Sequence, residues 1–221
     1  MSNSSMPPLP QTFLGAAMGR FVTDAFFKGA NFKEIPIDFV DFVLSAVQGG
    51  TSYVAYRVGC DAVAAISPEF KERLNDKSKN QLPVYIAGGA AGAAFATIIN
   101  YPISVVRSKR TNEKVSFSLK SFQMYYFDRV FAFMGFAASM DQIIPHLKPT
   151  NNSLHYWAQS HFLLQMSHFA GNLCEYPVYY IQNGTPFSLY MKNHLNSLTR
   201  RMFNSDFSCF FKKKLSGIPY M

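Results

Sequence analysis

Charged residues are scarce in this chain and make up 15% of its 221 residues. Because soluble domains carry about 25% charged residues, the sequence lacks the ions that cover an ordinary wetted surface. A disordered chain has few aromatic residues, whereas 16% of these residues are aromatic, so disorder is excluded. A mean hydropathy of 0.00 is too polar for a uniformly apolar bundle. The composition therefore favours a multi-pass membrane protein with a polar interior.

Cysteine is also sparse, and no apolar leader opens the chain. The three cysteines, Cys60, Cys174 and Cys209, form no CxxC pair, so we expect neither a disulfide framework nor a four-cysteine zinc site. The first residues hold no apolar run long enough for a secretory signal and are poor in arginine. We therefore expect any targeting signal to be internal.

The excess positive charge behind the net charge of +8 lies in two stretches of the chain. Residues 107–129 hold six basic and two acidic residues, and residues 192–214 hold six basic and one acidic residue. Each stretch follows a long apolar segment, as basic links on one side of a bilayer do under the positive-inside rule. A nucleic-acid surface would come with a recognisable binding motif, and the sequence has none. We expect no nucleic-acid partner.

The clearest membrane span is 80–106, which contains 27 residues and no charge. A helix needs about 20 apolar residues to cross a bilayer core of about 30 Å. Gly88, Gly92 and Ala96 recur every four residues and place small side chains on one helical face. Such faces let a second helix approach closely in membranes. The segment therefore predicts a span that packs tightly against a neighbour.

Further helices are predicted on both sides of this span. Residues 35–65 hold an uncharged centre, 127–144 form a shorter candidate, and 149–174 continue to 182 as a long amphipathic segment. The polar link 67–80 is typical of a short solvated helix. The predicted fold class is an all-α, multi-pass membrane bundle with about four transmembrane helices.

Two weak internal repeats order the chain. The sequence NYPISVV at 100–106 matches EYPVYYI at 175–181, each at the end of a long segment. FFKG at 26–29, followed by Ile-Pro at 35–36, matches FFK at 210–212, followed by Ile-Pro at 218–219. The order along the chain is thus FFK and Ile-Pro, helix, helix with Tyr-Pro, helix, helix with Tyr-Pro, FFK and Ile-Pro.

This order resembles the mitochondrial carrier family, and 87–110 is similar to the end of one of its odd-numbered helices. Each of the family's three repeats has a helix ending in Pro-x-acidic-x-x-basic, a matrix-side link with an aromatic-basic-Gly motif, and a return helix. The resemblance implies a divergent, truncated, carrier-like member without its first helix. It divides the chain into an N-terminal matrix-side segment (1–34), a transmembrane domain (35–182) and a basic C-terminal matrix-side segment (183–221).

The resemblance also locates degenerate carrier motifs and a lipid contact. The motif positions are Pro102, Ser104, Arg107, Pro177, Tyr179 and Gln182. In the family, the acidic and basic positions form salt bridges that close the matrix side and break during transport. Three of the four charged positions are lost here, so the usual bistable gate is missing and transport is not expected. Arg107 alone keeps its charge, and we expect it to anchor the end of a membrane span.

Lys28 and Gly29 match the family position that binds anionic lipid headgroups at helix N-termini. The resemblance thus implies membrane lipids, cardiolipin among them, as ligands. An exposed loop lysine is an equally good interpretation of Lys28.

Other chemistry finds little support in the sequence. His161 and His168 share a helical face and His155 lies near them, but no second set of ligands accompanies them, so neither a metal nor a haem is expected. No nucleophile motif or phosphate-binding loop is present. Asp38 and Asp41 are expected to be solvated at an interface. We predict no cofactor and no enzyme activity.

The sequence thus predicts a non-catalytic, multi-pass protein of the mitochondrial inner membrane. We expect it to be an accessory or structural subunit of a larger membrane assembly, such as a respiratory-chain complex, with other membrane subunits as partners. One alternative is an active solute exchanger with an altered gate. A second alternative is a component of an inner-membrane protein-import channel, whose members have glycine-rich spans.

Overall fold

The computed structural model describes residues 8–29, 39–110, 117–146, 153–196 and 198–216. Within these ranges the secondary structure is entirely helical, which confirms the predicted all-α class. The elements are α1 (Leu9–Gly29), α2 (Phe39–Ile66), α3 (Pro68–Asn75), α4 (Leu82–Arg110), α5 (Leu119–Ile143), the 3-10 helix η1 (Ile144–His146), α6 (Ser153–Asn183), α7 (Phe187–Asn196) and α8 (Leu198–Ser216).

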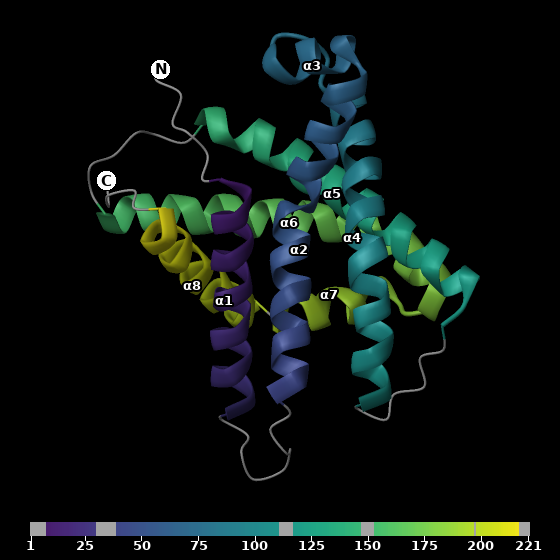
Figure 1. Cartoon of the computed structure of the whole chain (residues 1–221), viewed down its shortest axis with the longest axis vertical. Coiled ribbons are helices and arrows are strands. Elements are labelled where there is room, and N and C mark those ends of the chain that lie inside the picture. The colour runs from purple at the N-terminus through teal and green to yellow at the C-terminus, as the bar shows by residue number, and fades with distance from the viewer. Residues whose placement is uncertain (1–7, 30–38, 111–116, 147–152, 197, 217–221) are drawn as a thin grey trace.

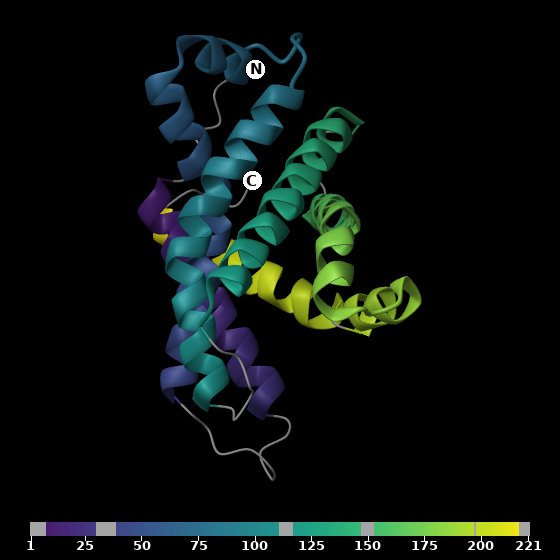
Figure 2. The same cartoon turned by 90° about the vertical axis from the view of Figure 1, so that its right-hand side faces the viewer.

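The long helices pack as a chain of neighbours that nearly closes on itself. Helix α1 packs on α2, α2 on α4, α4 on α5 and α5 on α6, while α8 returns to pack on α1. Figure 1 shows α1, α2 and α4 upright beside one another, with α8 crossing α1. Figure 2 shows α5 inclined away from α4 toward α6. Between α6 and α8 the contact is slight, so the ring has one weak side.

Local sequence explains where the helices begin. The Ser67 side chain accepts a hydrogen bond from the backbone N–H of Phe70 at 3.2 Å, and Pro68 occupies the first turn of α3. The predicted short helix in the link 67–80 is thus confirmed. Helix α5 starts at Leu119, earlier than the predicted 127, because Ser118 caps it by accepting from the N–H of Ser121 at 3.1 Å.

Helices also form in the segments expected to lie outside the bundle. Helix α1 falls within residues 1–34, and α7 and α8 fall within residues 183–221. Because α1 and α8 pack on each other and α1 packs on α2, the helical packing is not confined to residues 35–182. Within the described residues, a helix, α1, thus precedes α2. The assignment of these segments to one side of a membrane stays a prediction.

Polar and apolar side chains share the interior of this bundle. Among the described residues, the nine largest side chains that are less than 2% exposed include a single apolar one, Val84. The other eight are Asn100, Thr23, Thr51, Thr97, Asp24, Ser45, Ser167 and Ser208. Large apolar side chains are exposed on every long helix, such as Phe39 at 66% and Ile98 at 65%. Buried polar side chains and exposed large apolar ones are the informative departures from the pattern of a water-soluble domain, in which polar residues are mostly exposed.

Hydropathy singles out one helix among the described residues. Helix α4 alone is long and apolar enough to qualify as a membrane span by length and composition. The other long helices predicted as spans, α2, α5 and α6, fall short of this standard. Hydropathy by itself therefore does not establish a multi-pass bundle.

Glycines let the backbones of neighbouring helices touch. A Cβ atom at Gly92 of α4 would lie 2.7 Å from the carbonyl oxygen of Ala55 on α2. A Cβ atom at Gly135 of α5 would lie 2.8 Å from the carbonyl oxygen of Ala170 on α6, and one at Gly19 of α1 would overlap the backbone of Ser208 on α8. The three crossings share this device, which small-residue faces provide in membrane bundles.

We predict that Gly92→Ala destabilises the protein more than Gly89→Ala does. Both substitutions improve helix propensity equally, but a Cβ at Gly92 meets the backbone of α2, whereas the nearest atom at Gly89 belongs to the flexible Met134 side chain, 2.9 Å away. The overpacking cost at Gly92 is about 1–3 kcal/mol. Thermal unfolding in detergent, followed by circular dichroism, measures the difference. Equal midpoints for the two variants would contradict the tight α2–α4 crossing.

Candidate functional site

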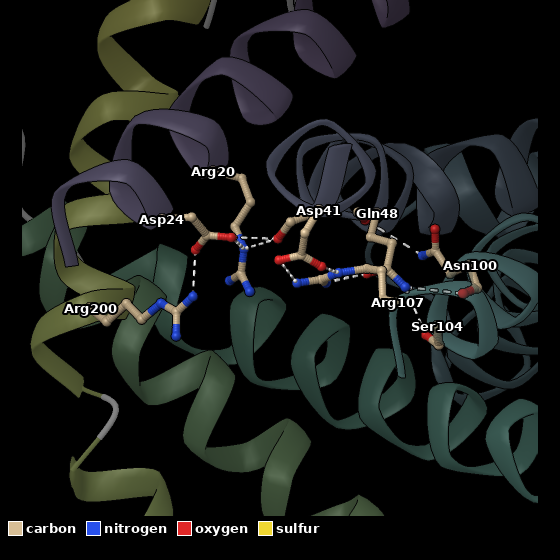
Figure 3. A network of polar contacts seen from close by, with 9 residues as sticks. Arg20, Asp24, Asp41, Gln48, Asn100, Ser104, Arg107 and Arg200 are labelled. Carbon is tan, nitrogen blue, oxygen red and sulfur yellow. Dashed lines mark hydrogen bonds and ion pairs between the residues drawn. The ribbon is translucent and has the colours of Figure 1, made fainter. Parts of the chain in front are cut away.

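The most distinctive site is a network of buried polar groups that runs from α8 through α1 and α2 to α4 (Figure 3). Its first centre is Asp24 of α1, whose exposed fraction is 0%. One carboxylate oxygen accepts from the Ser45 hydroxyl of α2 and lies 3.4 Å from Nε of Arg20. The other accepts from Nη2 of Arg200 on α8. Asp24 therefore ties three helices together.

The second centre is an ion pair between Asp41 of α2 and Arg107 of α4. Nε of Arg107 donates to Oδ1 of Asp41 at 2.7 Å, and Nη2 donates to Oδ2 at 3.3 Å. The remaining branch, Nη1, donates to the side-chain oxygen of Gln48 at 2.6 Å. Because Asp41 is only 3% exposed, this two-pronged pair lies largely out of water, where such pairs are strong and geometrically specific.

Gln48 extends the network along the α2–α4 interface. Its Nε2 donates to the Ser104 hydroxyl at 2.7 Å and to the carbonyl oxygen of Asn100 at 3.0 Å. The Asn100 amide in turn donates to the Ser52 hydroxyl of α2 at 3.1 Å. A glutamine between an arginine and a hydroxyl uses both its acceptor and its donors, so it fixes the register of α2 against α4.

The structure changes the interpretation of two sequence features. Asp41, expected to be solvated, is buried, while Asp38 lies outside the described residues. Arg107, expected to anchor the end of a span, instead points into the bundle and meets Asp41. The reason is that α2 starts at Phe39, which places Asp41 in its first turn, beside the last turns of α4. Ser104 joins the same network, so two of the degenerate motif positions come together.

The second degenerate motif is built differently. Pro177 lies inside α6 as Pro102 lies inside α4, and both prolines are exposed. The Tyr179 ring packs 4.8 Å from the ring of Tyr190 on α7. Gln182 is exposed near the end of α6. No charged group stands at the acidic or basic position of this motif.

The two Tyr-Pro repeats nevertheless occupy matching settings. The hydroxyl of Tyr101 donates to the carbonyl oxygen of Ser118, just before α5, at 3.3 Å. The hydroxyl of Tyr176 donates to the carbonyl oxygen of Thr185, just before α7, at 3.3 Å. In both cases the tyrosine ring also packs against aromatic rings of the element that follows. The repeat seen in the sequence is thus also a structural repeat.

The residue before each Tyr-Pro pair is buried and reaches the long helix that comes before its own helix in the chain. Asn100 contacts α2, as described above, and Glu175 of α6 lies 3.9 Å from Nη2 of Arg129 on α5. Arg129 also pairs with Asp128 and lies over the ring of Tyr125, with the guanidinium carbon 5.5 Å from the ring centroid. The Tyr190 hydroxyl donates to Glu175 at 3.0 Å. This second cluster joins α5, α6 and α7.

The structure places the predicted lipid contact at a helix C-terminus. Helix α1 ends at Gly29, so Lys28 and Gly29 are its last two residues rather than the start of a helix. The C-terminal end of a helix carries partial negative charge, so it offers an anionic headgroup no help from the helix dipole. The N-terminal helix geometry on which the lipid expectation depends is therefore not found here.

The histidines serve separate contacts. His161 of α6 pairs with Asp206 of α8 through Nε2, and the His168 ring packs 5.1 Å from the Phe136 ring. His155 lines a shallow surface hollow beside Leu154 and Phe162. Across the part of the chain that the structure describes, no three His, Cys, Asp or Glu side chains converge in an arrangement able to hold a metal ion.

Sequence reasoning missed the centre of the network. Arg20 and Asp24 stand four residues apart in an otherwise apolar stretch, which is the spacing of a helical ion pair. That signal is local and detectable. The pairing of Asp41 with Arg107, 66 residues away, leaves no comparable trace in one sequence.

No family model matches this chain, and no curated protein and no solved structure matches it either. The geometry of the helices and of the polar network is therefore what bears on function.

We predict that Asp41→Asn lowers stability strongly, because it leaves the Arg107 charge buried beside an uncharged amide. Breaking a buried pair on one side costs about 3–5 kcal/mol. The matched control is Glu69→Gln, which removes a carboxylate from an exposed pair with Arg73 on α3 and should cost about 1 kcal/mol or less. The unfolding midpoints of the two variants in detergent measure the difference in stability. A midpoint for Asp41→Asn as high as that for Glu69→Gln would rule out a structural ion pair.

Proposed function

We propose that this protein is a carrier-like, multi-pass membrane protein that no longer transports a solute. In this proposal it serves as an accessory or structural subunit of a mitochondrial inner-membrane assembly, such as a respiratory-chain complex. The observation that carries the proposal is a helical bundle that buries ionisable and polar side chains and exposes large apolar ones.

A bundle of this kind suits a lipid environment. In hydrocarbon, ionisable and polar side chains turn inward and pair with one another, as Asp24, Asp41 and Asn100 do. Polar residues that face inward lower the mean hydropathy of a helix without harming its fit to lipid. Helix α2 therefore falls short of a membrane span by composition. Its 28 residues nevertheless extend over about 42 Å, which is long enough for a core of about 30 Å.

The repeated packing supports the carrier-like part of the proposal. The α2–α4, α5–α6 and α8–α1 crossings each bring a glycine against a neighbouring backbone. Along the chain, the Tyr-Pro helices α4 and α6 are separated by α5. Helix α1 precedes α2 as α4 precedes α5. A bundle of three similar helix pairs is what the resemblance implies.

The pairing of Arg107 supports the loss of transport. A transport gate needs ion pairs that form in one state and break in another, which makes it a two-state element. Arg107 is held at three nitrogens by Asp41 and Gln48 of one neighbouring helix, and Ser104 accepts from the same Gln48. At the second motif, Tyr179 and Gln182 bring no charge. These positions act as fixed ties between helices.

An apolar seam on α6 supports a role in an assembly. Phe162, Met166, Phe169 and Leu173 are exposed at spacings of four, three and four residues. This spacing matches the contact line of a packed helix pair. The opposite face of α6 packs on α5, so the seam is available to another membrane subunit.

We predict that the protein migrates within a large complex on a native gel of mildly solubilised membranes. The double substitution Phe162→Ser with Phe169→Ser should release it, because it removes two aromatic contacts from the seam. A matched control is Ile86→Ser with Ile98→Ser, which changes two exposed apolar residues of α4 and should stay in the complex. Migration of the unaltered protein only as a monomer or small dimer would refute the assembly role.

A working exchanger is the second candidate, and one observation favours it. Ionisable side chains inside a membrane bundle often mark a solute or ion path, and Asp24 is such a side chain. The structural proposal predicts no exchange of labelled nucleotide, phosphate or carboxylate across liposomes that contain the purified protein. Exchange that is present in the unaltered protein and abolished by Asp24→Asn would favour the exchanger instead.

A further inference from the structure

The charges of the network around Asp24 do not balance. Its three guanidinium groups belong to Arg20, Arg107 and Arg200, and its two carboxylates belong to Asp24 and Asp41. The network therefore carries one surplus positive charge. Arg107 and Arg200 are near enough for their charges to act on Arg20. Because each arginine stays charged, the surplus has to be met by a group outside the network.

The surplus is located at Arg20 and Arg200. Within the described residues, Arg20 uses only Nε, which donates to the Ser45 hydroxyl at 3.2 Å and lies near Asp24, and its two terminal nitrogens contact no acceptor. Nη2 of Arg200 donates to Asp24, and Nε of Arg200 is buried without a hydrogen-bond partner. Donors of two guanidinium groups are thus left over around a single carboxylate.

Both guanidinium groups lie beside the same carboxylate. Arg20 contacts one oxygen of Asp24 and Arg200 contacts the other. In Figure 3 both groups extend to the same side of Asp24. The side chains are 33% and 38% exposed, so a ligand from outside can reach them.

The cluster around Arg129, the second one described above, has no surplus of positive charge. Arg129 of α5 lies between Asp128 and Glu175, so its cluster carries one excess negative charge. An anion is therefore favoured at α1 and α8 and disfavoured at α5 and α6. This contrast makes the site specific to one part of the bundle.

We propose that Arg20 and Arg200 bind a phosphate-type oxyanion beside Asp24, at the junction of α1 and α8. Guanidinium forks match the paired oxygens of phosphate and form strong, charge-assisted hydrogen bonds with them. The ligand is either a soluble phosphate compound or the headgroup of an anionic phospholipid, which share this chemistry. Bound there, it joins the first helix to the last. Anion binding at this site goes beyond the accessory role and does not depend on membership of a larger complex.

The experiment measures stabilisation of the full-length protein in a neutral detergent. Inorganic phosphate is titrated at constant ionic strength while the thermal unfolding midpoint is recorded. In a parallel arm the protein is placed in phosphatidylcholine bilayers with or without phosphatidylglycerol. We expect a saturable rise of the midpoint in at least one arm, because a ligand of the folded state stabilises it by mass action. A rise with phosphate assigns the site to a soluble compound, and a rise only with phosphatidylglycerol assigns it to a headgroup.

Three variants locate the site. Arg20→Lys keeps the charge but loses the fork, and we expect the midpoint response to need roughly ten to a hundred times more ligand. Arg20→Gln removes the surplus charge and should abolish the response. Arg73→Gln, on exposed α3, should respond like the unaltered protein. If Arg20→Gln does not fold, the comparison of Arg20→Lys with Arg73→Gln decides alone. No saturable rise in either arm, or an unchanged response in Arg20→Lys, overturns the proposal.

Discussion

A carboxylate without access to solvent organises this bundle. Asp24 has no exposed surface, and a buried charge is tolerated only when it is paired and hydrogen-bonded. Its donors come from α1 itself, from Ser45 of α2 and from Arg200 of α8. Those three helices must therefore meet at one point, although α1 and α8 stand at opposite ends of the described chain. Satisfying this one group joins α8 to α1 and α1 to α2, which is the part of the ring where the two ends of the described chain meet.

The same constraint explains the composition. The chain has few charged residues, and several of them form ion pairs between helices, such as Asp41 with Arg107 and Arg129 with Glu175. The outer faces of the long helices carry exposed apolar side chains instead. The buried polar groups and the exposed apolar side chains both enter the mean hydropathy of zero. Hydropathy averaged over a helix thus does not show which side chains are buried and which are exposed.

Local patterns made part of this fold predictable. The small-residue face at Gly88, Gly92 and Ala96 is buried as expected. The short helix predicted in the polar link 67–80 is α3, which Ser67 caps. Helix α8 escaped prediction because its basic residues are typical of a solvated link, and α1 because its charged pair interrupts an apolar run. The site was the least predictable part, since Asp41 and Arg107 pair across 66 residues through the placement of whole helices. Only the Arg20–Asp24 pair carried a local signal.

The ties between helices are unequal, and this bears on function. From α8 through α1 and α2 to α4, charged groups and close glycine contacts join each neighbour to the next. Between α6 and α8 the packing is slight, with the His161–Asp206 pair across it. A transporter needs a sealed wall on all sides of its path, because any gap lets ions leak. A subunit of an assembly needs no such seal, since a partner can cover the weak side. The uneven ring therefore fits a structural role better than a transport role.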